Sequence, residues 1–296
     1  MFRNARIYRL KSDWPDSEAT LSEKLTAAGF VPCGPLTERS SGFMEIDTGF
    51  GESLARRLNG ADLLKLRTQS RVLPTAVINE ALEERVEEYR QRMDEPPGRR
   101  EKRRLKAETR ESLLPKALLK SDKTWGYVDL GEKLIMVDAG NAAATERFML
   151  NLKMPFGDLV TAPLKFKKPM DELLKGVFMG NGPQGIQLGR ECIMADATDL
   201  RSKVRWTDFD LTDKSIRAHV ADGMRLTHLG IEYNNVMSCV LNEDGYISKI
   251  RFVGEEKDEA QSDADPLARF DANFVLLTGT LRALIKALKE NLGGYA

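Results

Sequence analysis

The chain contains few of the residues on which metal sites and nucleophilic catalysis most often depend. Three cysteines and two histidines occur among its 296 residues. The cysteines, Cys33, Cys192 and Cys239, are isolated and odd in number, so they are predicted to be buried reduced thiols rather than disulfides. His219 and His228 have no cysteine pair beside them, so a surface or hydrogen-bonded position is expected rather than zinc ligation.

The usual catalytic motifs are absent as well. No GxxxxGK(S/T) loop and no GxSxG elbow occurs, which argues against ATP-driven work and acyl transfer. The single GxGxxG match, at 180–185, follows a helix-like segment and precedes a strand-like one. This is the reverse of the phosphate-binding order, so we interpret it as a turn. Acid pairs such as Asp196/Asp199 and Asp208/Asp210 arise by chance in a chain with 45 acids. The sequence predicts no catalytic residue, no metal site and no cofactor.

Long apolar runs are also missing. No run approaches the ~20 residues that a membrane-spanning helix needs, and the N-terminal residues MFRNARIYRL lack the apolar core of a signal peptide. A content of 42% hydrophobic and 30% charged residues describes a folded, soluble protein. We therefore expect no membrane partner and a cytoplasmic location.

Charge is present in quantity but unevenly distributed. Although the formal net charge is zero, residues 99–110 (RREKRRLKAETR) hold seven Lys and Arg in twelve positions. Residues 80–98 hold three bases and seven acids, whereas residues 99–123 hold ten bases and four acids. Because salt confines a surface field to about ten ångströms, such a basic block can bind a polyanion whatever the total charge. The alternative is a solvated helix face.

The basic block belongs to a predicted helical hairpin. From Thr75 apolar residues recur at steps of three and four as far as Met93, until the turn at 95–98 breaks the pattern. A second helix is expected from about Arg99 to Leu114. Its apolar residues are too few for a stripe facing a core, so we expect an antiparallel hairpin that projects from the body, with one acidic and apolar arm and one basic and solvated arm.

Strand-like segments lie on both sides of the hairpin. The predicted strands are ARIYRL, FMEID, ADLLKLRTQSRVLP, TWGYVDL, KLIMVDA, GIQLGRECIMAD, AHVADGMRLTHLGIEY, VMSCVLNEDGYISKIRFVG and FDANFVLLTG. The predicted helices are one that begins at 15–17 and ends at Gly29, one at 142–153, DELLKGVFM, and a closing helix from about Thr280. The acidic segment 255–266 is expected to be a mobile loop between the last two strands.

This order of elements predicts an α+β protein with antiparallel strand-rich domains and an inserted long helical hairpin. Residues 1–75 and 113–165 are predicted to form a discontinuous central domain. Residues 76–112 form the hairpin, and residues 166–296 form a strand-rich C-terminal domain.

Several blocks of the chain resemble the RdgC family of bacterial recombination-associated proteins. The blocks are RIYRL at 6–10, FVPCG at 30–34, RVLPTAVI at 71–78, SLLPKA at 112–117, LIMVD at 134–138 and RFDANFVLLTG at 269–279. None is a catalytic signature, but their order and spacing cover nearly the whole length. The resemblance implies a non-enzymatic, nucleoid-associated protein that binds double-stranded DNA without sequence preference. It also implies a ring-shaped homodimer around the duplex that restrains strand exchange by the recombinase.

The resemblance also implies site residues. Bases within or beside the matched blocks are the leading candidates for the DNA-facing surface, and bases chosen for charge and proximity are weaker ones. The leading candidates are Arg67, Arg71, Lys116 and Lys120, and the weaker ones are Lys123, Lys203 and Arg205. The hairpin is expected to form one dimer contact and the C-terminal domain the other, through Leu82, Val86, Tyr89, Leu118, Trp206 and Phe209. Leu118 stands where an aromatic residue would fit the family, and the region 206–209 is more acidic and aromatic than expected.

Two other classes of protein stay open. A metal-dependent DNA-processing enzyme would use some of the carboxylates, and adding magnesium to bound duplex would reveal shortened products. A protein-interaction module would use the basic helix to bind an acidic partner such as the recombinase itself. Binding to plain duplex at moderate salt separates that class from a DNA-binding protein.

Overall fold

The computed structural model describes residues 2–46, 53–199, 201–254 and 265–296, and it confirms the α+β class. The strands are β1 (Asn4–Leu10), β2 (Arg39–Phe43), β3 (Ala55–Leu58), β4 (Ala61–Val72), β5 (Leu118–Asp129), β6 (Leu134–Val137), β7 (Thr161–Pro163), β8 (Ile186–Ala195), β9 (Lys203–Trp206), β10 (Arg225–Tyr233), β11 (Met237–Asn242) and β12 (Ile247–Phe252). The helices are α1 (Glu18–Leu25), α2 (Thr75–Met93), α3 (Arg99–Leu113), α4 (Ala142–Lys153), α5 (Met170–Phe178), α6 (Lys214–Ala221) and α8 (Pro266–Asn291), with short 3₁₀ turns η1 (Thr26–Ala28) and η2 (Leu114–Lys116).

All described strands belong to one antiparallel sheet. Its order is β2-β4-β5-β6-β1-β12-β11-β10-β8-β9, with β3 paired to β4 and β7 paired to β1. The sheet continues through both predicted strand-rich domains because β1 pairs with β6 on one side and with β12 on the other. The domain limits remain a prediction.

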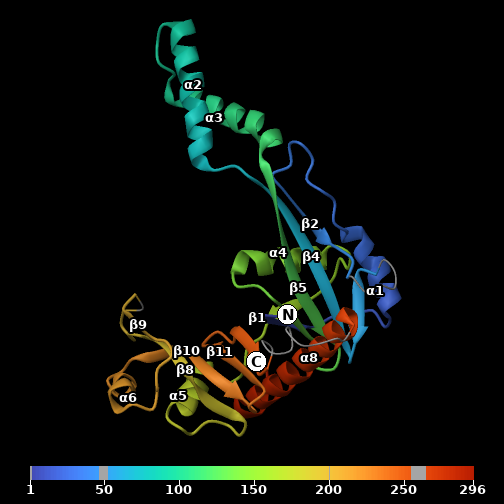
Figure 1. Cartoon of the computed structure of the whole chain (residues 1–296), viewed down its shortest axis with the longest axis vertical. Helices are drawn as coiled ribbons and strands as arrows, with labels where there is room; N and C mark the ends of the chain where they lie inside the picture. The colour runs from blue at the N-terminus through green and yellow to red at the C-terminus, as the bar shows by residue number, and fades with distance from the viewer. Residues whose placement is uncertain (1, 47–52, 200, 255–264) are drawn as a thin grey trace.

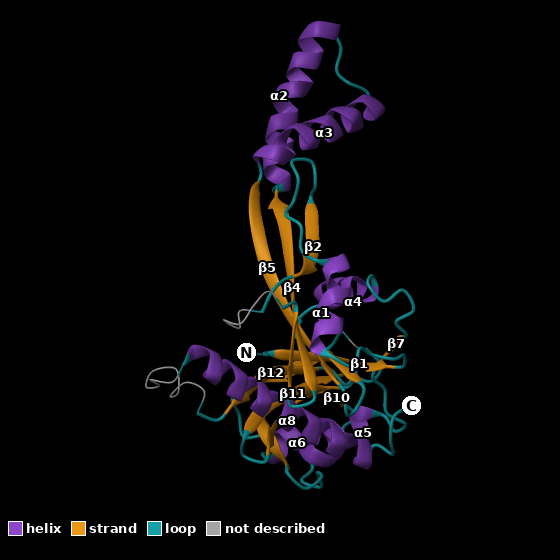
Figure 2. Ribbon diagram, turned by 90° about the vertical axis from the view of Figure 1, so that its right-hand side faces the viewer, coloured by secondary structure: helices purple, strands orange, loops and turns teal. Residues whose placement is uncertain are grey.

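One chain has the outline of a crescent (Figure 1). The α2–α3 hairpin stands at one end, and the region of β9 and α6 lies at the other. A long ribbon formed by β4 and β5 carries the hairpin away from the body (Figures 1 and 2). The predicted insertion of a projecting hairpin is therefore confirmed, although α3 crosses α2 obliquely instead of lying along its full length.

The ribbon is two-sided because side chains alternate along a strand. The strands β4 and β5 pair over their full length, from Ala61 opposite Asp129 to Val72 opposite Leu118. On one face, which we call the α4-side face, Phe148 of α4 packs so closely on Gly126 that an added Cβ would lie 2.3 Å from its ring. On the other, the α8-side face, Tyr127 meets Phe274 edge to face at 5.7 Å. Each face near the body thus has its own core.

One predicted strand is wrong over its whole length, and two others are wrong in part. The segment FDANFVLLTG is helical, because Asp265 caps α8 and Pro266 occupies its first turn, so the closing helix begins well before Thr280. Residues 218–221 of AHVADGMRLTHLGIEY belong to α6, which Asp213 caps. The strand expected at FMEID lies earlier in the chain and ends at Phe43.

Other expectations are confirmed. The GxGxxG segment is a turn between α5 and β8. Cys192 and Cys239 are free and buried, as predicted, and burial raises the pKa of each thiol to about 12. The same prediction is wrong for Cys33, which is free but only half-buried. Within the described residues, none of the helices is long and apolar enough to cross a membrane. Most of the predicted acidic loop, at 255–264, lies outside the described residues.

Candidate nucleic-acid interface

The register of the ribbon separates the leading basic residues by face. Arg67 lies directly opposite Lys123, and both point to the α8-side face. Lys120 lies opposite Ser70 and points to the α4-side face. Lys120 and Lys123 are exposed on one strand, three residues apart, so they point in opposite directions.

The two arginines on the α8-side face, Arg67 and Arg71, contact other parts of the protein, whereas Lys123 on this face is exposed. The Arg67 guanidinium lies 4.7 Å from the centroid of the Phe30 ring and donates to the Ser121 hydroxyl at 3.1 Å. The segment that contains Phe30 also crosses this face, because the Cys33 backbone N–H donates to the Gln69 side-chain oxygen at 2.9 Å. The outer part of the α8-side face is therefore partly covered.

Arg71 has a structural position on the same face. Its Nη1 donates to the carbonyl oxygens of Leu114, Pro115 and Ala117 at 3.0 to 3.2 Å. Its Nη2 donates to the carbonyl oxygen of Gly34 at 3.0 Å. Arg71 thus ties the base of the hairpin to the segment that crosses the ribbon, and both of its terminal nitrogens already have carbonyl partners.

The α4-side face collects bases that the sequence did not indicate. Arg39 on β2 lies opposite Ser70, which in turn lies opposite Lys120, so three neighbouring strands bring Arg39 and Lys120 to one face. Arg147 projects from α4 beside them. Burial lowers the pKa of Arg147 first, the charge of Arg39 lowers it further, and Asp122 raises it. Two guanidinium groups thus lie within electrostatic reach of one another.

Carboxylates neutralise only part of this α4-side cluster. Asp122 pairs with Lys120 at 3.1 Å, and both side chains are more than half exposed, so the pair is weak in water. Within the described part of the chain, neither Arg39 nor Arg147 forms an ion pair. Arg39, Lys120 and Arg147 are positioned to accept an external anion.

The outer end of the ribbon is apolar. Leu118 is 80% exposed, and Val72, directly opposite on the same face, is 45% exposed. Lys116 is exposed in η2, between the hairpin and these residues. Two adjacent apolar side chains that are exposed at the end of a strand are typical of a contact with another protein surface.

The hairpin residues proposed for dimer contact differ in their accessibility. Leu82 is already buried within the hairpin, while Val86 and Tyr89 are half-buried. At the other end of the sheet, Phe209 is 48% exposed, and its ring centroid lies 5.6 Å from that of Trp206.

Lys203 and Arg205 are exposed on β9, the strand at the far end of the sheet. They pair by register with Ala195 and Ile193 of β8. The structure therefore does not bring them together with the bases of the ribbon.

The acid pairs serve local turns. Asp196 accepts hydrogen bonds from the Thr198 hydroxyl and backbone, which hold its pKa below the usual value, and Asp210 does the same with Thr212. Asp208 pairs with Arg190 at 2.7 Å. Across the described ranges, no group of three or more His, Cys, Asp or Glu side chains is arranged to hold a metal ion.

The fold and the ribbon define a mixed α+β protein built on one antiparallel sheet, with a basic ribbon that carries a helical hairpin. A family model described as "Putative exonuclease, RdgC" matches residues 1–295. The chain belongs to the RdgC family, as its sequence blocks predicted.

Curated relatives with the name "Recombination-associated protein RdgC" match nearly the whole length of both chains. The relative from Halorhodospira halophila is 32% identical over 302 residues, which cover 99% of this chain and 98% of the relative. The relative from Enterobacter sp. is 31% identical over 302 residues, covering 100% of this chain and 98% of the relative. The relative from Edwardsiella ictaluri is 31% identical over 296 residues, with 99% and 98% covered.

Proposed function

We propose that two copies of this chain form a ring around double-stranded DNA, bind it without sequence preference and restrain strand exchange by the recombinase. The observation that carries this proposal is the crescent outline of one chain (Figure 1). Its two ends, the hairpin and the β9–α6 region, are the two contacts that the sequence analysis expects. Two crescents related by a two-fold axis make two isologous contacts and close a ring.

The α4-side face of the ribbon is the part that we place against the duplex. Arg39, Lys120 and Arg147 are not saturated by carboxylates, whereas Arg67 and Arg71 on the opposite face are engaged with the protein. Figure 1 draws α4 on the concave side of the ribbon, which supports this choice. Phosphate contacts of this kind position a duplex without reading its sequence.

A salt titration on linear and closed-circular duplex tests the proposal. If roughly six phosphates are contacted, log affinity falls against log salt with a slope of about −5, because each contact contributes about 0.9. Complexes on closed circles should outlast those on linear duplex at high salt. A ring can slide off the free ends of a linear duplex, but a closed circle has no end. A slope near zero or a strong preference for one sequence would overturn the proposal.

The proposed mechanism is occlusion, without turnover of a substrate. Inhibition of strand exchange should then follow the fraction of duplex covered, and it should weaken with salt in parallel with DNA binding. A variant that no longer binds duplex yet inhibits the recombinase fully would favour an interaction module that acts on the recombinase directly.

The description of the family model makes nuclease activity the second candidate. Its test is incubation of the protein with bound duplex and magnesium or manganese, followed by a search for shortened products. Shortened strands that disappear with a chelator would replace occlusion by a processing activity.

A further inference from the structure

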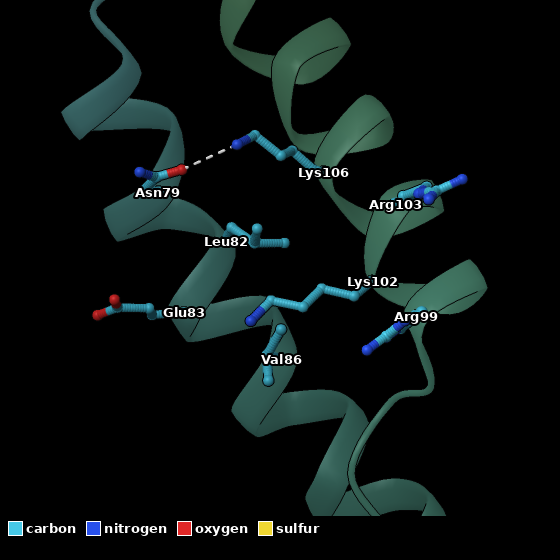
Figure 3. A pocket seen from close by; sticks show the side chains of 8 residues that line it. All are labelled: Asn79, Leu82, Glu83, Val86, Arg99, Lys102, Arg103 and Lys106. Atoms are coloured by element: carbon cyan, nitrogen blue, oxygen red, sulfur yellow. Dashed lines mark hydrogen bonds between the residues drawn. The ribbon is translucent and has the colours of Figure 1, made fainter.

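A groove runs between the two helices of the hairpin (Figure 3). Its volume is about 730 Å³, and its lining is Asn79, Leu82, Glu83, Val86, Arg99, Lys102, Arg103 and Lys106. The α3 side carries four bases, while the apolar side chains of Leu82 and Val86 lie on the α2 side. A row of bases on one side of a groove, beside apolar side chains on the other, is suited to bind an amphipathic segment with an acidic face.

The four bases of the groove have few partners within the described chain. Lys106 donates to the Asn79 side-chain oxygen at 3.2 Å (Figure 3), and none of the four forms an ion pair among the described residues. Two of the three acids of α3, Glu101 and Glu108, pair with Arg104 on the same helix. The four bases thus have no ion-pair partner in the described residues, and Glu83 is the one acid in the lining of the groove.

The matching negative charge lies on α2 of the same hairpin but faces elsewhere. Glu80, Glu84, Glu87 and Glu88 are exposed and share a helix face. At about 100° per residue this face is turned well over 90° from the face that lines the groove. Among these four, Glu87 is the one with side-chain partners in the described residues: it contacts Arg90 at 3.9 Å and accepts a hydrogen bond from the Gln91 side-chain amide at 3.5 Å. The hairpin thus holds two complementary charged stripes that cannot meet within one chain.

We infer that the groove receives α2 of a second copy of this chain, whose acidic stripe pairs with Arg99, Lys102, Arg103 and Lys106. The inference rests on the proposed dimer and identifies how its hairpin contact is made. The two stripes also match in length, at about 12 Å for residues 80–88 and about 10 Å for residues 99–106. By two-fold symmetry each α2 then lies between its own α3 and the partner's α3.

A second copy fits the groove better than a duplex does. The apolar side chains of Leu82 and Val86 make no favourable contact with phosphates, and the carboxylate of Glu83, which also lines the groove, repels them. An α-helix, in contrast, fills a groove of this kind with apolar side chains while its charges meet at the edges. Charge pairing across the contact also selects the correct partner and orientation.

Two reversed variants of the full chain test the inference. The first carries Arg99→Glu, Lys102→Glu, Arg103→Glu and Lys106→Glu, and the second carries Glu80→Lys, Glu84→Lys, Glu87→Lys and Glu88→Lys. A spin label at Met93→Cys, which is half exposed, reports the distance between the two hairpins in a Cys33→Ser background. Circular dichroism verifies helix content.

The expected result is a short inter-hairpin distance in the otherwise unaltered chain that each reversed variant loses. It returns when the two variants are mixed in equal amounts, and it returns in a chain that carries both reversals, because opposite stripes then meet again. Retention of the distance in either single variant, or no recovery on mixing, overturns the inference while leaving the ring intact. A chain without a short distance before any reversal overturns both the hairpin contact and this inference.

Discussion

The two ends of the crescent are built from different material. The two helices of the hairpin end have only four buried residues, Ile78 and Leu82 on α2 with Leu105 and Thr109 on α3. The other end is a strand, β9, fixed in the sheet by its register with β8. A projecting element with so small a core gains much of its order from what it contacts. A contact at the hairpin is therefore expected to depend on its partner, whereas the β9 end is preformed.

Removing the hairpin should have the largest effect, because it eliminates one of the two proposed dimer contacts. Deleting 78–111 and joining the stump with a Gly/Ser linker should leave a dimer that is open on one side. Arg71 keeps its carbonyl partners at 114–117, so the ribbon should stay ordered. Complexes on closed-circular duplex should then dissociate at high salt as fast as those on linear duplex. Sedimentation provides the check, because a monomeric product would make the hairpin the sole contact.

The proposed dimer contact at the β9 end can be weakened separately. Phe209→Asp places a charge on the exposed ring position beside Trp206 and should weaken this contact without unfolding the sheet. Alone it should leave a dimer held by the hairpin, whereas the combination with the hairpin deletion should give monomers. Lys214→Asp, which reverses a charge in the nearby α6 without removing an apolar ring, serves as the control. A dimer that survives the combination would place the contact elsewhere.

The ribbon that joins the two ends offers a matched pair of lysines. Lys120→Glu should weaken duplex binding and reduce the salt slope by about one, because a phosphate contact on the α4-side face is lost. Lys123→Glu removes the same charge from the same strand on the opposite face and should have a much smaller effect. Adding Arg39→Glu to Lys120→Glu should reduce the slope by about two. Equal effects of the two single reversals would contradict the assignment of the faces.

Arg71 is expected to act on stability. Arg71→Met leaves several carbonyl oxygens at the hairpin base without a donor, which costs on the order of 1–3 kcal/mol of unfolding free energy. Arg71→Lys keeps the charge but cannot make the forked contact, so it should restore only part of the lost unfolding free energy. Thermal unfolding measures the loss. If both variants lose duplex affinity at unchanged stability, Arg71 faces the DNA instead.

The sequence predicted the elements with strong periodicity and missed those whose pattern depends on a neighbour. The hairpin, the strands β4, β11 and β12 and the second half of β5 followed from local spacing, whereas the first half of β5, from Leu118, was missed. The error at FDANFVLLTG arose because four adjacent apolar residues have no visible helical face until Phe274, Leu277 and Leu281 are seen as one buried stripe.

The candidate site was predictable only in part for a similar reason. The predicted strand TWGYVDL begins at Thr124, so the sequence did not place Lys120 and Lys123 on a strand. Once β5 is seen to begin at Leu118, alternation puts the two lysines on opposite faces. No local pattern places Arg39 beside Lys120, because that proximity depends on the register of β2 with β4 and of β4 with β5. Arg147 reaches the same face only through the packing of α4.

The smallest expected effect concerns His228, near the β9 end. Its ring nitrogens contact the Thr227 hydroxyl at 3.0 Å and the Asn242 amide at 3.2 Å. Burial lowers the pKa of His228 first and Lys203 lowers it further, while Glu243 raises it, Arg205 lowers it and Asp244 raises it. The imidazole is therefore neutral over more of the acidic range than a free histidine.

This lowered pKa reports whether the β9 end also meets DNA. If phosphates neutralise Lys203 and Arg205, the charged imidazolium is less disfavoured, so the pKa of His228 should rise toward its ordinary value in the complex. By linkage, affinity should then increase slightly as the pH falls from the pKa of His228 in the complex to its lower pKa in the free protein, and it should stay constant below that pH. Because the chain has two histidines, proton NMR resolves the titration of His228 with and without duplex. A pKa that duplex leaves unchanged at saturation would restrict the DNA-facing surface to the ribbon and its surroundings.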